Sequence, residues 1–469
     1  MPGWPAASPG SHLNDIVQSL SGIVDAARIL DSAAVSERAT SFWSSEPMQA
    51  GALVTPITCD EVADVLRHCD KRKQAVLTHG GLTNCVTGVE SSLEDVVIST
   101  EKMRGIIDID RVGGTATVEA GAILQTVQET IAAEGLYFPL DLGARGSCTI
   151  GGNVSTNAGG INVLRYGMMR NLVLGLETVL ADGTVVTSLN RMVKNNAGYD
   201  TKQMFIGSEG TLGIVTRVVL RLFPQPTSRQ SALVAMNSFS AVTAFLGHLQ
   251  QQLAGSLCAF EVMWNDYYHA VTAEGWHRAP LARDHAFYVV FQAEGTDADL
   301  DCFEDILSTA LEDGLIVDAM LPKSEAETRD IWNIREDFEA LTEEPHYYLY
   351  DVSLPIKDMS DYIDEVYRRI VARWPLGHAY TLGHVADGNL HLFVVPGDPG
   401  ANHHEASECV YGPLREYDGS VSAEHGIGLD KTGWLPHSRS ATDIDLMRTL
   451  KRTLDPNNIL NPGRVLQLN

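Results

Sequence analysis

The chain has 469 residues, 44% of them hydrophobic and 20% charged, which is the composition of a globular protein large enough for two or three domains. Its 34 basic and 60 acidic residues give a net charge of −26, which argues against nucleic acid and anionic lipid as partners. No apolar run is long enough to span a membrane, and the seven cysteines show no Cys-x-x-Cys spacing, so neither a disulfide framework nor a zinc ribbon is expected. Residues 1–10 carry no secretory signal, and we expect a cytoplasmic protein.

The first part of the chain alternates helix and strand patterns. The periodicity predicts, in order, one or two amphipathic helices over residues 13–39, a strand at 51–56, a helix at 58–71 and a strand at 75–78. The turn that follows contains Gly80 and Gly81, and consecutive glycines let backbone N–H groups approach a phosphate closely. A plain hairpin turn is an equal alternative for this turn alone, and its place after a strand–helix–strand unit is what favours a pyrophosphate site.

The segment from Pro139 to Gly160 is the least ordinary part of the sequence. It has six glycines in the 18 residues from Gly143 to Gly160, without low-complexity repetition. So much Gly, Ser, Thr and Asn costs conformational entropy unless a ligand or tight packing orders the segment. A large, flat, polar cofactor would order it. The segment is preceded by strand patterns at 96–98, 105–110 and 115–121 and by a predicted helix at 123–134.

A change in composition near residue 224 marks the first domain boundary. Before it come a strand pair within 167–186, a second glycine set at 207–213 and a strand at 214–223. After it, strands are predicted at 257–263, 286–292, 347–354 and 390–395, and helices at 240–251, 297–313, 324–341 and 359–374. This order predicts an antiparallel sheet with helices on one face, and therefore an α+β fold. A helix at 440–454 then leads to a compact tail at 455–464.

Three residues of this second half predict a metal site. His384 and His391 lie seven residues apart, with an Asp387-Gly388 turn signal between them, and Glu424 lies beside His425. Imidazole and carboxylate ligands suit Zn, Mn, Fe or Co, and three protein ligands leave a position open for substrate. A single histidine is more often buried and hydrogen-bonded than a ligand, but the combination favours a catalytic metal.

Taken together, these motifs resemble one flavoprotein family. The turn at 79–84, the segment 139–160, the glycine set 207–213, the histidine motif 383–391, Glu424-His425-Gly426 and the tail 455–464 are similar to those of the FAD-linked D-2-hydroxyacid dehydrogenases. That family includes D-2-hydroxyglutarate, D-lactate and glycolate dehydrogenases and belongs to the vanillyl-alcohol-oxidase superfamily.

The resemblance implies a domain order and a cofactor. An N-terminal helical segment (1–45) would precede a two-lobed FAD-binding domain (46–224) and a ferredoxin-like substrate and metal domain (225–430), and residues 431–469 would return to the FAD domain. FAD would be bound noncovalently, because Leu82 rather than His follows the double glycine. The implied cofactor-binding residues are Gly80, Gly81, Leu82, Thr83, Asn84, Pro139, Gly143, Ser147, Thr149, Gly151, Gly152, Asn157, Gly159, Gly210, Ile214 and Asn461.

The same resemblance implies roles in oxidation of a D-2-hydroxy acid. His384, His391 and Glu424 would hold a divalent metal, zinc above the others. His425 would be the base, with a fourth metal ligand as its alternative. Arg335 would bind the substrate carboxylate, and otherwise forms a helix ion pair with Glu339. Asn389 would contact metal or substrate, or support the turn.

One departure concerns the substrate. Relatives specific for 2-hydroxyglutarate carry Lys immediately before the Tyr-Asp pair of this strand, and here Leu349 precedes Tyr350 and Asp351. Either Tyr347, Tyr348 or another arginine would then bind a second carboxylate, or the substrate is smaller or apolar, like lactate.

Partners and alternatives follow from the same comparison. No nicotinamide fingerprint is present, so electrons would pass to an electron-transfer flavoprotein, a quinone or a cytochrome, and a homodimer is compatible with the family. The alternatives are a non-redox FAD enzyme of the alkyl-glycerone-phosphate synthase type and a silent flavin subunit of a larger dehydrogenase. The synthase would call for more cationic residues to bind its substrate phosphate, and a silent subunit would lack the metal-binding residues.

Overall fold

The computed structural model describes residues 9–344 and 346–468, in two compact units. The first unit contains the chain up to residue 158, residues 168–225 and the chain from 424 onward, and the second contains Gly159–Gly167 and Pro226–Ala423. The prediction that residues 1–10 carry no secretory signal falls almost wholly outside the described residues. Among the described residues, no helix is both long and apolar enough to cross a membrane.

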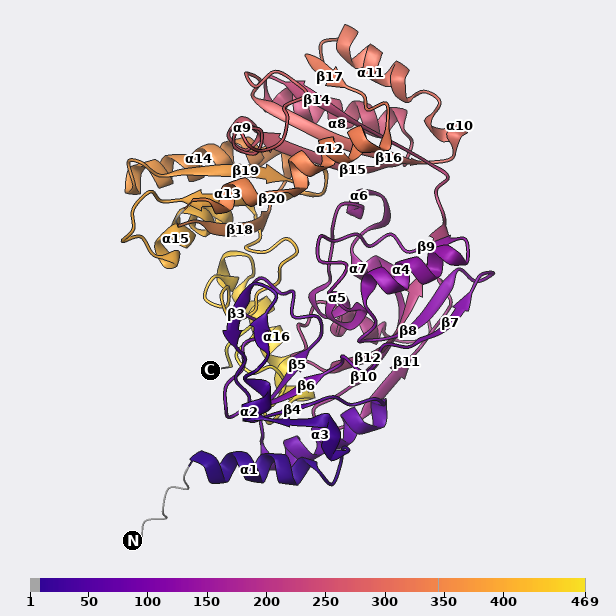
Figure 1. The fold of residues 1–469 in the computed structure, drawn as a ribbon, viewed down its shortest axis with the longest axis vertical. Coiled ribbons are helices and arrows are strands. Elements are labelled where there is room, and N and C mark those ends of the chain that lie inside the picture. The colour runs from indigo at the N-terminus through magenta and orange to yellow at the C-terminus, as the bar shows by residue number, and fades with distance from the viewer. Residues whose placement is uncertain (1–8, 345, 469) are drawn as a thin grey trace. The chain divides into compact units, whose positions relative to one another are not determined.

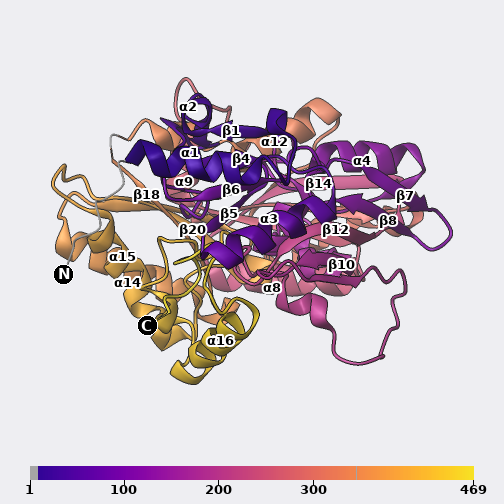
Figure 2. The same ribbon diagram turned by 90° about the horizontal axis from the view of Figure 1, so that it is seen from below.

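The first unit begins with a four-stranded sheet. Its order is β1 (Ile29–Asp31), β4 (Ala52–Val54), β6 (Val96–Ser99) and β5 (Val76–His79), and β4 and β5 run parallel to β6. Figure 2 shows these strands beside α1 (Pro9–Leu20) and α3 (Cys59–Arg72). The predicted cap of α3 is present, because the Thr58 side chain accepts a hydrogen bond from the Glu61 N–H at 3.2 Å.

Helix and strand alternate before β4, where only helices were expected. The short helix α2 (Ser32–Val35) follows β1, and the hairpin of β2 (Ala39–Ser41) and β3 (Ser44–Pro47) follows α2. The expected one or two helices within 13–39 correspond to α1 and α2, but the strand β1 that lies between them was not expected. β1 pairs antiparallel with β4, so tertiary pairing decides the conformation of this short apolar segment.

The second sheet of this unit is antiparallel. Its order is β11 (Val185–Ser188), β10 (Val173–Val179), β12 (Ile214–Arg221), β8 (Thr115–Glu119) and β7 (Ile106–Asp110). The helices α4 (Leu124–Ala133), α5 (Ile150–Thr156) and α7 (Met169–Leu172) belong to the same unit, together with the short pair of β9 (Leu136–Tyr137) and β13 (Phe223–Pro224).

The C-terminal tail is fixed to the first unit by a buried lysine. Lys451 lies near the end of α16 (Ala441–Leu454), and its ammonium group donates to the Thr211 carbonyl at 2.9 Å, to the Leu460 carbonyl at 2.7 Å and to the Asp455 carboxylate. The Asp455 carboxylate also accepts the Leu460 N–H at 2.8 Å. One buried ion pair thus joins the helix, the tail and the loop before β12.

The second unit is built on one seven-stranded antiparallel sheet (Figure 1). Its order is β17 (Asp318–Met320), β14 (Ser228–Met236), β16 (Phe287–Gly295), β15 (Leu257–Trp264), β19 (His378–Gly383), β20 (Asn389–Val395) and β18 (Tyr348–Ser353). Its main helices are α8 (Phe239–Gln252), α9 (Asn265–Val271), α11 (Phe303–Glu312), α12 (Glu325–Glu336), α13 (Glu339–Thr342), α14 (Met359–Arg373) and α15 (His403–Leu414).

Helices cover both faces of this sheet. Phe260 of β15 packs against Phe245 of α8, with ring centroids 6.3 Å apart. Its neighbour Glu261 bonds to Arg335 of α12. Consecutive strand residues point to opposite faces, so α8 and α12 lie on opposite sides. The expectation that helices cover one face was wrong, and the face that carries Glu261 is the one that matters for the site.

We predict that Lys451→Met will destabilise the first unit strongly. The substitution leaves the fully buried Asp455 carboxylate without its cation, a loss that typically costs about 3–5 kcal/mol. Urea unfolding measures the change. The control Lys71→Met removes an exposed ammonium from α3 and should alter the unfolding free energy by no more than about 0.5 kcal/mol. Equal effects of the two substitutions would contradict the structural role of Lys451.

Candidate active site

A tight turn places the two predicted histidine ligands next to each other. β19 ends at Gly383, His384 follows, and the single turn of η4 (Val385–Asp387) leads through Gly388 into β20. Gly388 has a φ of 94°, a left-handed conformation that glycine adopts without strain. The predicted Asp387-Gly388 turn is confirmed. The rings of His384 and His391 have their centroids 5.4 Å apart.

His384 is oriented by a carboxylate that the sequence analysis did not single out. Glu261 of β15 is 1% exposed, and its Oε1 lies 2.7 Å from His384 Nδ1. Burial alone would raise the pKa of the Glu261 carboxyl, but the neighbouring His384 and Arg335 side chains hold that pKa below its ordinary value. Glu261 is therefore an anion in the interior of the unit.

His391 has a carboxylate neighbour of its own. The buried Asp351 of β18 lies opposite His391 in the strand register, with Oδ1 3.9 Å from His391 Nδ1. The Oδ1 atom also accepts a hydrogen bond from Asn389 Nδ2 at 2.8 Å, and Oδ2 accepts the Ala423 N–H at 3.0 Å. Asp351 thus ties the strand that carries His391 to the segment that leads into Glu424.

Glu424 and His425 directly follow this anchored residue in the chain. His384, His391 and Glu424 form a group whose candidate ligand atoms lie within 4.8 Å of one another. Asp351, His391 and His425 form a second such group. These two groups contain the residues predicted from the sequence as metal ligands and as base, and those roles stay predictions.

Asn389 supports this region with its amide nitrogen. Nδ2 donates to Asp351 Oδ1 and to the Val352 carbonyl at 3.0 Å, so half of the amide is used to hold the strands. Oδ1 is buried and has no hydrogen-bond partner among the described residues. A buried acceptor of this kind is available to a ligand.

Arg335 is buried beside His384. Its Nε lies 2.9 Å from Glu261 Oε2, and its Nη2 lies 3.4 Å from His384 Nε2. The alternative pairing with Glu339 is not formed, since Arg335 is 9% exposed and Glu261 is its ion-pair partner. Nη1 makes no hydrogen bond to any described residue, which leaves donors for a carboxylate.

The double-glycine turn packs tightly against the glycine-rich segment in the first unit. A Cβ on Gly81 would lie 2.1 Å from the Ser147 carbonyl oxygen, and one on Gly80 would lie 2.5 Å from Thr149 Oγ1. Only glycine permits this approach of the two backbones. The Asn84 side chain then closes the turn by accepting the N–H groups of Val86 and Gly88, each at 3.0 Å.

The hairpin of β2 and β3 contacts the same turn. The Phe42 N–H donates to the Leu82 carbonyl at 2.9 Å, and Trp43 Nε1 donates to the Thr83 carbonyl at 3.2 Å. His79, just before the turn, is buried with Nε2 2.8 Å from the Val89 carbonyl oxygen. Burial lowers the pKa of His79 to about 4, so its ring is neutral near pH 7.

The segment after Ser147 forms the short helix α5. Thr149 is its N-cap and accepts the Gly152 N–H at 3.2 Å. A Cβ on Gly151 would lie 2.6 Å from the Ala120 Cβ, so α5 sits directly on the end of β8. Asn157 ends α5 with a φ of 51°.

The other predicted cofactor residues are spread over the two units. Pro139 and Ile214 are buried, and a Cβ on Gly143 would meet no atom within 4 Å. Asn461 links two segments by hydrogen bonds. Its Oδ1 accepts the Thr78 N–H at 3.0 Å, and its Nδ2 donates at 2.7 Å to the carbonyl of Glu209, the residue before Gly210. Gly159 belongs to the second unit.

A second carboxylate missed by sequence analysis holds the loop after His425. Glu209 accepts the N–H groups of Ile427 at 2.7 Å and Gly428 at 2.8 Å. Burial raises the pKa of Glu209, and these two backbone hydrogen bonds act in the opposite direction. The glycine-rich turn Gly426-Ile427-Gly428 is thus held in place by hydrogen bonds from its backbone N–H groups to Glu209.

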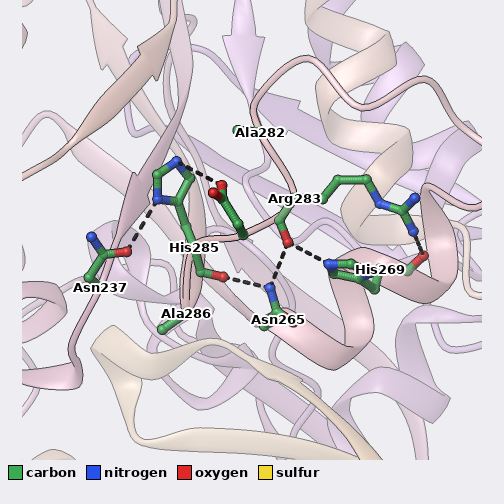
Figure 3. A pocket seen from close by; sticks show the side chains of 8 residues that line it. Asn237, Asn265, His269, Ala282, Arg283, His285 and Ala286 are labelled. Carbon is green, nitrogen blue, oxygen red and sulfur yellow. Dashed lines mark hydrogen bonds and ion pairs between the residues drawn. The ribbon is translucent and has the colours of Figure 1, made fainter.

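A separate hollow of about 730 Å³ lies elsewhere in the second unit (Figure 3). It is lined by Asn237, Asn265, His269, Ala282, Arg283, Asp284, His285 and Ala286. Its polar groups bond to one another: Asn265 Nδ2 donates to the Arg283 carbonyl at 3.0 Å, and His285 Nδ1 lies 3.2 Å from Asn237 Oδ1. It contains none of the predicted site residues, and we assign it no role.

Two family models match the chain. Residues 50–188 match the FAD binding domain, and residues 225–465 match the C-terminal domain of FAD-linked oxidases. The two matched ranges fall in both units.

Full-length relatives agree. The chain is 38% identical to rat mitochondrial D-2-hydroxyglutarate dehydrogenase over 88% of this chain and 78% of that protein. It is 34% identical to a putative mitochondrial D-lactate dehydrogenase of Schizosaccharomyces pombe, over 87% of this chain and 80% of that one. The crystal structure of p-cresol methylhydroxylase with substrate bound superimposes with a TM-score of 0.75 at 17% identity, over 97% of this chain and 96% of that chain, which shows a shared fold. The chain therefore belongs to the FAD-linked D-2-hydroxyacid dehydrogenase family, with a fold of the vanillyl-alcohol-oxidase type.

Proposed function

We propose that the protein oxidises a D-2-hydroxy acid to the 2-oxo acid with help from a divalent metal held by His384, His391 and Glu424. The observation that carries this proposal is the convergence of these three side chains, with a buried arginine beside one of them. A silent flavin subunit would not require both a ligand set and a carboxylate-binding cation. The names of the relatives, D-2-hydroxyglutarate and D-lactate dehydrogenases, support the substrate class.

The residues present fit a divalent metal. Two imidazoles and a carboxylate are the donor set that zinc and similar ions take in catalytic sites. The buried, unpartnered Oδ1 of Asn389 adds an acceptor to the same turn. A bound cation supplies Lewis-acid chemistry: it lowers the pKa of a hydroxyl group and fixes a chelating substrate.

The protein's own residues would bind and deprotonate the substrate. Arg335 is held at its Nε edge by Glu261, so Nη1 is the end that meets the carboxylate of the hydroxy acid. His425, beside a ligand residue in the chain, would take the proton of the 2-hydroxyl group as the general base. FAD held at the Gly80-Gly81 turn would supply the hydride acceptor that this oxidation needs.

The double-glycine turn is our candidate for the FAD pyrophosphate cradle. The fit is supported by the contact of Gly80 and Gly81 with the backbone at 147–149, where side chains could not be accommodated. Backbone N–H groups in such a turn form an anion-binding concavity. FAD held in this way would be noncovalent, and the buried His79 next to the turn is engaged with the Val89 carbonyl.

Leu349 favours a substrate without a second carboxylate. Leu349 and Asp351 point to the same face of β18, and Leu349 lies opposite Phe393 in the register. Phe393 packs against Phe338 and Tyr347, with ring centroids 5.5 Å and 6.0 Å away. The Tyr348 hydroxyl is bonded to the Ala401 carbonyl at 3.1 Å. These surroundings suit an apolar or short tail such as that of lactate.

The first prediction concerns FAD binding. Gly81→Ala should weaken it, because the new Cβ must push the Ser147 carbonyl away; overpacking of this kind costs about 1–3 kcal/mol, roughly tenfold to a hundredfold in affinity. The ratio of flavin to protein after purification measures the effect. Gly22→Ala, whose Cβ would meet nothing within 4 Å, is the matched control and should retain full flavin content.

The second prediction tests the reaction itself. Under anaerobic conditions, D isomers of 2-hydroxy acids should bleach the flavin absorbance and L isomers should not. Chelator treatment should abolish the bleaching, and zinc or manganese should restore it. His391→Asn should behave like the chelated protein while keeping FAD, whereas His404→Asn, an exposed histidine of α15, should behave like the unmodified protein. Absence of bleaching with every hydroxy acid would reject the proposed oxidation.

The third prediction tests the tail of the substrate. Leu349→Lys should raise kcat/KM for D-2-hydroxyglutarate relative to D-lactate, because a charge-assisted hydrogen bond contributes about 1.5–3 kcal/mol, roughly tenfold to a hundredfold. Val371→Lys adds the same charge at an exposed position of α14 and controls for general attraction of anions. An unchanged ratio in Leu349→Lys would show that this position does not meet the tail.

A further inference from the structure

Glu261 lies where a carboxylate is hardest to accommodate. Every residue of β15 is buried, and Glu261 is the charged residue in the run Leu-Cys-Ala-Phe-Glu-Val-Met-Trp. A buried anion is destabilising unless cations or hydrogen-bond donors compensate for the lost hydration. Nothing in the fold of the sheet requires a carboxylate at this position, so its presence calls for a role.

The two oxygens of Glu261 have different partners. Oε1 lies 2.7 Å from His384 Nδ1, and Oε2 lies 2.9 Å from both Nε and Nη2 of Arg335. One carboxylate therefore connects the histidine and the arginine side chains. The connection is completed by the 3.4 Å approach of Arg335 Nη2 to His384 Nε2.

This arrangement determines which nitrogen of His384 carries the proton. An ionised carboxylate can only accept a hydrogen bond, so the His384 Nδ1 atom that lies 2.7 Å from Glu261 Oε1 carries a proton and donates it. In the neutral ring, Nε2 is then the nitrogen without a proton. Nε2 is therefore the atom through which this tautomer would bind a metal ion.

We propose that Glu261 is a positioning residue that couples the metal site to the substrate-binding arginine. It holds His384 in the Nδ1–H tautomer and in the ring orientation that a metal requires, and its other oxygen holds the guanidinium of Arg335. This inference rests on the proposed function, namely on a metal bound at His384. Carboxylates that orient metal-binding histidines typically contribute tenfold to a hundredfold to metal affinity.

The test is the substitution Glu261→Gln in the FAD-loaded, chelator-treated protein. Its amide has the shape of the carboxylate, but it presents an N–H₂ group to one of the two donors and removes the charge. We expect the dissociation constant for Zn²⁺, measured by isothermal titration calorimetry, to rise about tenfold to a hundredfold. KM for the hydroxy acid should rise as well, because Arg335 loses its anchor. A Zn²⁺ affinity equal to that of the unmodified protein would overturn the inference.

The matched control is Glu294→Gln. Glu294 lies on the neighbouring strand β16, is also fully buried, and pairs with Arg229 at 3.0 Å but with no histidine. The same substitution there should lower stability and leave the Zn²⁺ affinity unchanged. If Glu294→Gln weakens Zn²⁺ binding as much as Glu261→Gln does, the effect is general loss of packing and the inference fails. If the unmodified protein itself binds no Zn²⁺, the proposed metal site fails together with the inference.

A second measurement requires no substitution of Glu261. Two-bond couplings in ¹⁵N-histidine NMR spectra distinguish the tautomers, and the His384 signal is assigned by its disappearance in His384→Asn. We expect the Nδ1–H form in the Zn²⁺-loaded protein. Observation of the Nε2–H form would contradict the role assigned to Glu261 even if Glu261→Gln does not fold.

Discussion

The candidate site depends on one constraint: a carboxylate can be buried in the sheet of the second unit only if donors surround it. Glu261 and Asp351 are both essentially inaccessible to solvent. Glu261 takes His384 and Arg335 as its partners, and Asp351 takes Asn389 and the Ala423 N–H. The same contacts that make burial of these anions tolerable fix the side chains that would bind metal and substrate. Stability and chemistry are therefore served by the same groups.

In the first unit, the candidate cofactor cradle depends on backbone packing. It contains no buried anion at the double-glycine turn, and it depends on how closely two backbones approach. Gly81 lies against the Ser147 carbonyl, and Gly428 lies so close to the Val86 carbonyl that a Cβ there would be 1.9 Å from the oxygen. Side chains are excluded by contact at this turn, whereas at the candidate site of the second unit they are selected by charge.

The sequence predicted the parts of the molecule that depend on local signals. Most strands and helices, the Asp387-Gly388 turn and the Thr58 cap could be predicted from spacing and residue type. Resemblance to a family supplied the ligand roles of His384, His391 and Glu424, which stay predictions. The break of the predicted helix 324–341 into α12 and α13, at Asp337 with its extended backbone, was not predicted. Helices on both faces of the sheet were also missed, although the run of β15, apolar except for Glu261, is typical of a strand buried on both sides.

Glu261 and Asp351 were missed because their roles are set by strand register rather than by sequence distance. Glu261 lies 123 residues from His384 in the chain, and Asp351 faces His391 only through the pairing of β18 with β20. One signal was available. A single carboxylate inside a strongly apolar strand has a large desolvation free energy, and such a residue therefore indicates a specific role.

Charge gives an independent reason for a cation at this site. Glu261, Asp351 and Glu424 are three carboxylates, and Arg335 is one guanidinium, so with neutral histidines the group carries two negative charges in formal surplus. The net charge of −26 on the whole protein does not offset this local negative charge. A divalent cation on His384, His391 and Glu424 would balance the group and would leave Arg335 as the positive end that meets a substrate carboxylate. The fixed charges thus favour the same occupant as the geometry of the ligands does.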